Sequence, residues 1–285
     1  MAVLNIVEAS IENLQNALTS GSITSVELVA RLLRSMSTYD CRGLALNSIP
    51  ILNNTLFEQA AKSDERRASE VIPTGIPCMV KDSYKVKGMV AATGSPAFEH
   101  LVSNEDAFLV KLIQDAGGVL IGRTNMPAMA CGGMQRGIWG RAENPYNPDY
   151  LAAAFASGSS NGSAVSTAAS FAAFGLGGET DLFIQSRQLA VVSNMRRTST
   201  SYQKHEDMLT LLDVIAAPDP VAKGDLWREQ SSVQLPQPWG DRPASFQDLA
   251  SSDSLSGLRI AVPEIFLGGP VPEGAKPVHT SQAVI

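Results

Sequence analysis

The residues best suited to chemistry lie in a serine-rich turn at residues 157–163, which reads Ser-Gly-Ser-Ser-Asn-Gly-Ser. Gly158 and Gly162 permit a tight turn and bring backbone N–H groups close to a bound group. A serine-dense turn that opens an alanine-rich helix, predicted over Ala164 to Phe174, suits serine-based acyl transfer or anion binding. The same pattern is typical of a loop that caps a helix, so the turn alone leaves both interpretations open.

A second segment that could carry chemistry, Gly75–Asp82, ends on a lysine and an aspartate, Lys81 and Asp82. The apolar residues of this segment predict a short buried strand. A lysine at the end of a strand is ordinarily a surface residue, because buried lysines are rare. If Lys81 is buried, desolvation lowers the pKa of its amine, which can then act as a base. This segment alone favours a surface lysine.

Residues 158–162 also fit G-x-S-x-G, the nucleophile elbow of α/β-hydrolases. That interpretation makes Ser160 the nucleophile and requires an acid and a histidine further along the chain. The histidines available there are His205, at the start of a predicted helix, and His279, near the end of the sequence. Neither lies in a strand-to-loop context, and residues 152–157, which precede the turn, are small and polar-bounded rather than a strong central strand, so the elbow is a weaker alternative.

Two further turns could line a pocket, at Arg123–Asn125 and Cys131–Gly133. Turn residues that follow a strand need no such role. The glycines of 117–122 do not fit a dinucleotide-binding fingerprint, and the sequence has neither a phosphate-loop motif nor a His/Cys metal set.

The elements that must position these residues alternate between helices and strands. Strand, helix and strand between residues 75 and 122 indicate a parallel crossover, and hence an α/β fold. Residues 183–203 have neither a helical nor a strand period, and 217–256 are polar and rich in Pro and Ser, which predicts an irregular loop. Helices are predicted at 10–18, 54–68, 105–117 and 206–216, and the capping box of Thr24 and Glu27 predicts a further helix that begins there. Strands are predicted at 75–82, 119–122 and 258–262.

Composition narrows the function classes. The chain has 285 residues, of which 44% are hydrophobic, and a net charge of −6, so a nucleic-acid-binding surface is not suggested. Its three cysteines lie far apart and indicate reduced thiols rather than a disulfide framework. The N-terminus does not resemble a signal peptide, and no stretch is long and apolar enough to span a bilayer. We expect a cytoplasmic protein that binds neither nucleic acid nor membrane; the sequence leaves its oligomeric state open.

Taken together, these segments resemble the amidase signature family, because the motifs occur in that family's order. Gly75–Asp82 resembles its lysine strand, Ala116–Met126 its following helix, strand and turn, and Gly158–Ala164 its Ser/Gly signature. The resemblance runs from about residue 10 to 180, resumes around 205–228, and is closest to fungal members. It implies an α/β fold in which a mixed β-sheet core lies between α-helices, incomplete here at its C-terminal end.

The resemblance also implies a reaction, the hydrolysis of a small-molecule amide by a Ser-Ser-Lys triad without a cofactor. Lys81 is the implied base, and Ser159 is the implied bridging serine, preceded by a cis peptide bond. A second serine downstream forms an acyl-ester, from which water releases an acid, after ammonia or an amine has left. Substrate-binding residues are implied at Ala130, Ser159, Thr180, Asp181 and Leu182, the last three offering backbone N–H groups to the oxyanion.

The sequence departs from the family pattern where that second serine is expected. Gly175–Thr180 still follows the pattern, but the family's spacing from Ser159 places Phe183 at the nucleophile position. A phenyl ring cannot attack a carbonyl group, and the nearest hydroxyl, on Ser186, is displaced by three residues. A second hypothesis is therefore a catalytically inactive family member that acts at most by binding.

The expected organisation is one incomplete amidase domain over residues 1–285. The abrupt loss and return of the resemblance suggest a deletion or altered reading frame between Thr180 and Lys204, with truncation at the C-terminus. The predicted parts are an N-terminal helical part (1–70), a signature core (71–180), an aberrant segment (181–204) and an irregular loop (217–256).

Overall fold

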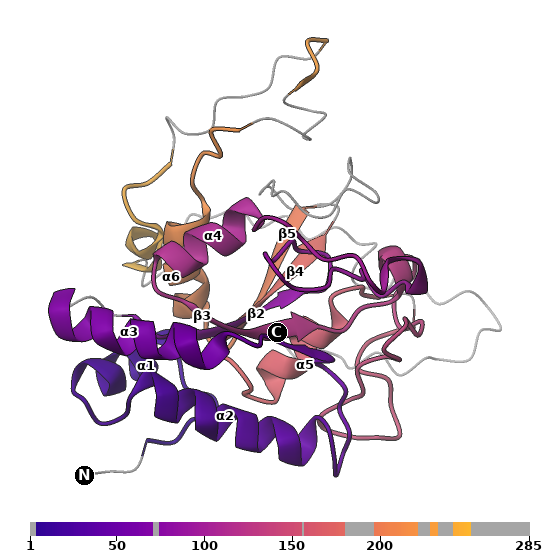
Figure 1. Cartoon of the computed structure of the whole chain (residues 1–285), viewed down its shortest axis with the longest axis horizontal. Helices are drawn as coiled ribbons and strands as arrows, with labels where there is room; N and C mark the ends of the chain where they lie inside the picture. The colour runs from indigo at the N-terminus through magenta and orange to yellow at the C-terminus, as the bar shows by residue number, and fades with distance from the viewer. Residues whose placement is uncertain are drawn as a thin grey trace. The chain divides into compact units, whose positions relative to one another are not determined.

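A computed structural model describes residues 4–70, 74–155, 157–179, 197–221, 229–232 and 242–251. Residues Met1–Ala250 form one compact unit. Its described strands form a mixed five-stranded sheet with helices on both sides (Figure 1). The predicted α/β class with a mixed sheet between helices is confirmed, and the division into domain parts stays a prediction.

The centre of the sheet is parallel and its edges are antiparallel. The strands are β1 (Ile51–Leu52), β2 (Pro77–Lys81), β3 (Val119–Thr124), β4 (Phe174–Glu179) and β5 (Arg197–Tyr202). β2 pairs in parallel with β3 and with β4, while β1 pairs antiparallel with β3 and β5 antiparallel with β4. The order is therefore β1-β3-β2-β4-β5. Every residue of β2 and β3 is buried, as expected for parallel strands covered on both faces.

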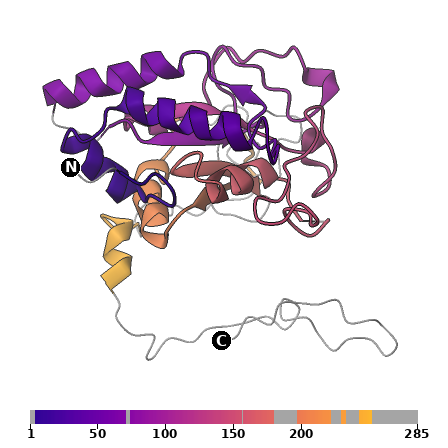
Figure 2. The ribbon, with the colours of Figure 1, turned by 90° about the horizontal axis from the view of Figure 1, so that it is seen from below.

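Six α-helices of the described part pack around this sheet. They are α1 (Ile11–Thr19), α2 (Ser25–Tyr39), α3 (Leu56–Glu70), α4 (Phe108–Asp115), α5 (Asn161–Ala168) and α6 (His205–Ile215). Figures 1 and 2 show α2 and α5 on the same side of the sheet, and Figure 1 shows α4 on the other side, next to α6. The helices predicted at 10–18, 54–68, 105–117 and 206–216 are thus confirmed, with ends shifted by a few residues.

Two connections leave the central strands in opposite directions. From β2 the chain passes through α4 to β3, and from β3 through α5 to β4 on the far side of β2. Crossovers between parallel strands are right-handed, so helices of two opposite crossovers lie on opposite faces, as Figure 1 shows for α4 and α5. The chain therefore leaves the carboxyl ends of β2 and β3 toward different faces. Open α/β sheets bind their ligands at such divergent strand ends.

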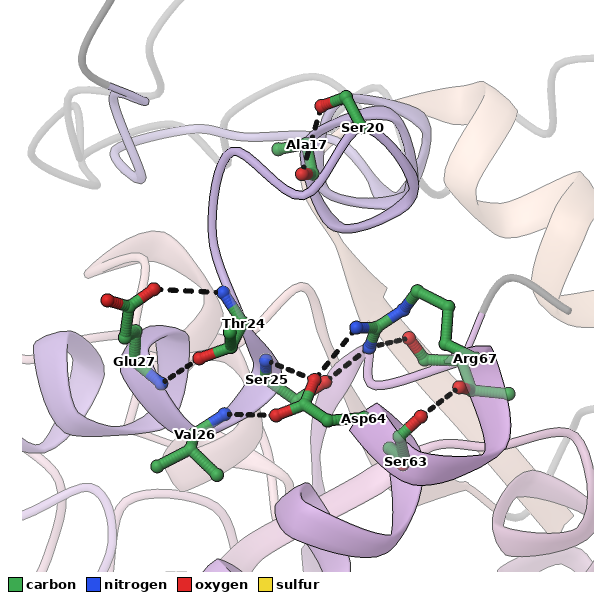
Figure 3. Close-up of polar contacts among 10 residues, drawn as sticks. Ala17, Ser20, Thr24, Ser25, Val26, Glu27, Ser63, Asp64 and Arg67 are labelled. Atoms are coloured by element: carbon green, nitrogen blue, oxygen red, sulfur yellow. Dashed lines mark hydrogen bonds and ion pairs between the residues drawn. The ribbon is translucent and has the colours of Figure 1, made fainter. Parts of the chain in front are cut away.

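The N-terminus of α2 has the capping box that its sequence predicts (Figure 3). The Thr24 hydroxyl accepts a hydrogen bond from the Glu27 N–H at 3.1 Å, and the Glu27 carboxylate accepts one from the Thr24 N–H at 3.0 Å. These bonds satisfy two of the N–H groups that a helix leaves unpaired at its start. Ser10 and Asn13 form the equivalent box at the start of α1.

Asp64 of α3 joins that same end of α2 to the chain that leads into β2 (Figure 3). Its carboxylate accepts hydrogen bonds from the backbone N–H groups of Ser25 at 2.7 Å and Val26 at 3.2 Å, and it pairs with Arg67 at 2.8 Å. Arg67 also donates to the Thr74 carbonyl at 2.9 Å. Burial by itself raises the pKa of Asp64, but the hydrogen bonds from Ser25, Arg67 and Val26 outweigh it and hold the pKa below its ordinary value.

The helix predicted over residues 164–174 is wrong in its second half. α5 ends at Ala168, Ser170 has a φ of 58°, and β4 begins at Phe174. Alanine and glycine fit either structure, so the run itself has no distinguishing period. Pairing with β2 decides the outcome, because Phe174 and Gly175 lie opposite Cys78 and Met79 in the parallel ladder.

β5 lies in the segment 183–203, for which the sequence predicts no periodic structure, so that interpretation is wrong for residues 197–202. The strand pairs with β4 along its length, from Tyr202 opposite Phe174 to Arg197 opposite Glu179. Its sequence, Arg-Thr-Ser-Thr-Ser-Tyr, has no alternation of apolar and polar residues, which is why the pattern missed it. A 3-10 helix, η5 (Phe246–Ser251), lies within the predicted loop 217–256, and the strand predicted at 258–262 lies outside the described residues.

Replacing Asp64 tests the connection between α2 and α3. Asp64→Ala leaves two helix N–H groups and the Arg67 guanidinium without this carboxylate, so we expect the free energy of unfolding to fall by about 1–3 kcal/mol. Urea denaturation at pH 7 measures the change, with Glu65→Ala, an exposed residue of the same helix, as the matched control.

The Asp64 contribution also has a predicted pH dependence. Because the pKa of Asp64 is lowered in the folded state, its contribution is present above the unfolded pKa of about 4 and is lost as the pH falls through the lower folded value. The difference between wild type and Asp64→Ala should shrink at acidic pH. A difference that stays constant from pH 7 to 3 would contradict the assignment.

Cys78 of β2 gives a second test of the packing. Burial raises the pKa of its thiol to about 12, whereas Cys41 and Cys131 are exposed. The thiolate is the form that alkylating reagents attack. Iodoacetamide at pH 8 should therefore modify Cys41 and Cys131 in the folded chain and reach Cys78 only after addition of denaturant, as peptide mass spectrometry can measure.

Candidate active site

The residues predicted to carry chemistry meet at the carboxyl ends of the parallel strands. Lys81 is the last residue of β2, Thr124 is the last residue of β3, and Gly178 lies near the end of β4. Ser159 and Ser160 come directly before α5, which packs against these strands. Four separate elements thus contribute to one location.

Lys81 lies at the centre of this location. Its side chain is fully buried, with an exposed fraction of 0%. Its Nζ donates hydrogen bonds to Ser159 Oγ at 2.6 Å, to Ser160 Oγ at 3.0 Å and to the Gly178 carbonyl at 3.2 Å. The interpretation of Lys81 as a surface residue, favoured by its own segment, is wrong. A buried amine requires such hydrogen bonds, because its transfer from water without them is costly.

The backbone of the serine turn approaches two other segments closely. Gly158 has a φ of 150°, and a Cβ atom there would lie 2.9 Å from the Gly133 carbonyl oxygen. A Cβ atom on Gly162 would lie 2.3 Å from the backbone nitrogen of Asn125, just after β3. Both glycines are therefore needed for close packing. The Gly158–Ser159 peptide bond is cis.

The two serines of the cluster differ in exposure and in hydrogen bonding. Ser159 is buried, whereas Ser160 is half-buried. Ser160 holds the N-cap position of α5, but its hydroxyl makes no capping bond to that helix. It instead accepts a hydrogen bond from the Gly178 N–H at 3.1 Å and donates to the Gly178 carbonyl at 3.3 Å.

A buried ion pair fixes the strand ends beside Lys81. Arg123 Nε donates to Asp82 Oδ1 at 2.9 Å, and a second guanidinium N–H donates to the Asp82 carbonyl at 2.7 Å. The Gly94 N–H donates to the other carboxylate oxygen at 2.9 Å. Burial raises the pKa of Asp82, and the Arg123 charge counteracts that rise. The pair therefore joins β2 to β3 directly after Lys81.

Hydroxyl groups hold α5 and β4 in place around the cluster. The hydroxyls of Thr124 and Ser163 lie 2.7 Å apart, and Ser163 also donates to the Leu176 carbonyl at 3.0 Å. Tyr84, just after β2, donates to the Gly177 carbonyl at 2.7 Å. The Thr124–Ser163 contact joins the end of β3 to α5. The bonds from Ser163 and Tyr84 then join α5, and the segment just after β2, to β4.

The turns singled out from the sequence have mixed outcomes. Arg123 and Thr124 belong to β3 rather than to a turn, and Asn125 is bonded through its amide to the Asn47 carbonyl. Ala130 ends the 3-10 helix η2 (Ala128–Ala130), and the segment that follows reaches the serine turn, where Asn161 donates to the Gly133 carbonyl at 2.8 Å. The substrate-binding role predicted for Ala130 stays a prediction.

Other predicted residues do not join the described cluster. His205 is an exposed residue that begins α6, and the Ser160 hydroxyl forms its hydrogen bonds with Lys81 and Gly178. Within the part of the chain that the structure describes, an amine rather than an imidazole therefore lies beside Ser160. Thr180, Asp181, Leu182, Phe183, Ser186 and His279 lie outside the described residues, so their predicted roles stay predictions.

Among the residues that support the cluster, sequence reasoning missed Tyr84 and Ser163 altogether, and it named Arg123 and Thr124 only as turn residues that could line a pocket. A signal was available for Arg123: an acidic residue ends one buried strand and a basic residue lies near the end of the next. In the parallel register Val80 lies opposite Arg123, which brings Arg123 next to Asp82. No comparable sequence pattern indicated that the hydroxyls of Thr124 and Ser163 would meet.

Two general features of the residues that the structure describes bear on the kind of site. In that part of the chain, no group of three His, Cys, Asp or Glu side chains is placed to hold a metal ion. None of its helices combines the length and apolarity needed to cross a bilayer.

The fold and this cluster define an α/β protein with a lysine–serine site at the carboxyl ends of its parallel strands. A family model described as Amidase matches residues 27–181. A glutamyl-tRNA(Gln) amidotransferase subunit from Exiguobacterium sibiricum is 28% identical over 295 residues, covering 96% of this chain and 57% of the relative. The corresponding subunit from Deinococcus radiodurans is 30% identical over 282 residues, covering 91% and 54%.

A solved structure shares the fold. The native peptide amidase of Stenotrophomonas maltophilia superimposes with a TM-score of 0.70 at 25% identity, covering 80% of this chain and 51% of that one. Because the family model matches more than half of the chain, the chain belongs to the amidase family. It spans about half the length of the relatives that it matches.

Substitution of Arg123 tests the ion pair beneath the site. Arg123→Met leaves the buried Asp82 carboxylate without its counter-charge, so we expect a loss of about 3–5 kcal/mol in the free energy of unfolding. Arg141→Met, which removes the half-exposed pair with Glu143, is the control and should cost no more than about 1 kcal/mol. If urea denaturation gives the same loss for both variants, the buried Asp82–Arg123 pair contributes no more to the free energy of unfolding than the Arg141–Glu143 pair.

Proposed function

We propose that this chain carries the proton-transfer part of an amide-hydrolysing site, with Lys81 as the base and Ser159 as the bridging serine. The observation that carries the proposal is the 2.6 Å hydrogen bond between a fully buried lysine amine and the hydroxyl of Ser159. Membership of the amidase family supports it independently.

This geometry supports the proposed chemistry. A neutral amine can accept a proton, and a hydroxyl between the amine and the reacting group can relay it. In the proposed reaction, Lys81 takes the proton of a nucleophilic hydroxyl through Ser159 while that oxygen bonds to the amide carbonyl carbon. Lys81 then returns the proton to the departing ammonia or amine, and water cleaves the acyl-ester. No cofactor enters any of these steps.

The named relatives and the net charge of the chain support a proposal for its substrate class. The relatives are named as a peptide amidase and as subunits of an amidotransferase that acts on glutamyl-tRNA, so amide chemistry is shared although the named substrates differ. We propose a small-molecule amide for this chain, because its net charge of −6 does not favour nucleic acid. We also propose that the chain acts in the cytoplasm and not at a membrane.

Phe183 favours a second candidate function. The family's spacing from Ser159 puts this residue where the nucleophilic serine is expected, and phenylalanine has no hydroxyl to activate. Loss of the nucleophile leaves only the residual catalysis that binding and oxyanion contacts supply. The second proposal is therefore a catalytically inactive member of the family that retains the lysine–serine pair and acts at most by binding.

Amide turnover tests the first candidate. Purified wild type is assayed for ammonia or amine release from a panel of aliphatic and aromatic amides. If Lys81 is the base, Lys81→Met should lower kcat/KM by about 100-fold or more, because the variant keeps the length of the side chain and removes the amine. Lys111→Met, an exposed lysine of α4, is the matched control and should leave turnover unchanged.

Phe183→Ser separates the two candidates. If Phe183 has removed the nucleophile, wild type shows no turnover, Phe183→Ser gains it, and the double variant with Lys81→Met loses it again. Turnover by wild type that depends on Lys81 would contradict the inactive candidate. Absence of turnover in both wild type and Phe183→Ser, each shown to be folded by circular dichroism, would contradict amide hydrolysis altogether.

A further inference from the structure

The hydroxyl of Ser160 is the reactive group that the family pattern leaves unassigned. It lies 3.0 Å from Lys81 Nζ, within the range at which a base takes a proton directly. The more buried hydroxyl of Ser159 lies 2.6 Å from the same amine. One amine therefore touches two hydroxyls.

The local structure of Ser160 differs from that of an ordinary helix cap. A serine at an N-cap position typically accepts a hydrogen bond from the second or third N–H of its helix. Ser160 makes no such bond in α5, and its hydroxyl is directed instead to Lys81 and to the backbone of Gly178. The hydroxyl is thus held by the site and not by the helix that it begins.

Exposure distinguishes the two serines. Ser159 is buried, with an exposed fraction of 7%, whereas Ser160 is half-buried. A nucleophile must reach a substrate atom, while a relay has only to touch the base and the nucleophile. The geometry therefore suits Ser159 as the inner hydroxyl and Ser160 as the outer one.

We propose that Ser160 is the acyl-accepting nucleophile of this chain, activated by Lys81, in place of the hydroxyl that position 183 lacks. This inference deepens the amide-hydrolysing function proposed above and rests on it. The substrate class is a small amide or activated ester whose carbonyl carbon can approach Ser160 Oγ.

The proposed step conserves atoms and charge. Neutral Lys81 accepts the Ser160 hydroxyl proton as Oγ bonds to the carbonyl carbon. The C–N bond of the tetrahedral intermediate then breaks, and Lys81 gives its proton to the leaving amine. Water attacks the Ser160 ester with Lys81 as base, and the proton returns to the Ser160 oxygen as the acid leaves. No oxidant, reductant or metal is consumed.

A fluorophosphonate probe tests the inference directly, because a nucleophilic serine oxygen displaces its fluoride and forms a stable ester. Folded wild-type protein is incubated with the probe, digested, and mapped by tandem mass spectrometry. We expect the adduct on Ser160, at a rate that falls by about 100-fold or more in Lys81→Met. Ser157→Ala, an exposed serine of the same turn, is the control and should label like wild type.

Each outcome decides the proposal. Adduct on Ser160 that depends on Lys81 supports it. Three results overturn it: an adduct on Ser159 or Ser186, labelling of Ser160 that is unchanged in Lys81→Met, or no adduct on wild-type protein that shows a cooperative thermal transition. Ser160→Ala, checked for the same transition, must abolish the labelling.

Amide turnover then separates this inference from the function on which it rests. Wild-type turnover that persists in Ser160→Ala keeps the proposed function and rejects Ser160 as nucleophile. Labelling of Ser160 without turnover of any amide in the panel keeps the reactive serine and rejects amide hydrolysis. Turnover lost in both Ser160→Ala and Lys81→Met supports the two proposals together.

Discussion

Burial of the Lys81 amine is the constraint on which the arrangement of the strand ends depends. An amine removed from water is stable only where hydrogen-bonding groups replace its hydration, and here two serine hydroxyls and a backbone carbonyl do so. These groups come from the turn before α5 and from β4, so both must lie within about 3 Å of the end of β2. The lysine thus couples the chemistry of the site to the packing of the sheet.

The groups around Lys81 are held by a second set of interactions at the same strand ends. The Asp82–Arg123 pair joins β2 to β3, and the Thr124–Ser163 contact joins β3 to α5. The absence of a side chain at Gly162 lets α5 approach Asn125 closely. Because the crossovers through α4 and α5 lie on opposite faces, the chain leaves β2 and β3 in different directions. This divergence is what an α/β sheet uses to make room for a ligand.

Much of this arrangement could be predicted from the sequence, and the remainder has physical reasons for being hidden. The capping box of Thr24, the buried strands and the crossover through α4 follow from local patterns. The pairing of Lys81 with Ser159 follows only from the family resemblance, because the isolated segment favoured a surface lysine. The polar residues of β5 have no strand period, and the alanine-rich run before Phe174 has no period that separates helix from strand. In both places pairing with a distant strand decides the structure, and pairing is not encoded locally.

The distances along the chain between the partners of Lys81 have a consequence for how the protein folds. Ser159 and the Gly178 carbonyl lie 78 and 97 residues from the lysine in sequence. Contacts of such long range form only after the entropy of closing large loops has been overcome, and a high share of them slows folding. During synthesis the full set of hydrogen bonds to the Lys81 amine therefore cannot form until β4 has left the ribosome. Helices α2 and α3 contact each other and both precede β4, so their contact can form before that moment, but the lysine–serine site cannot.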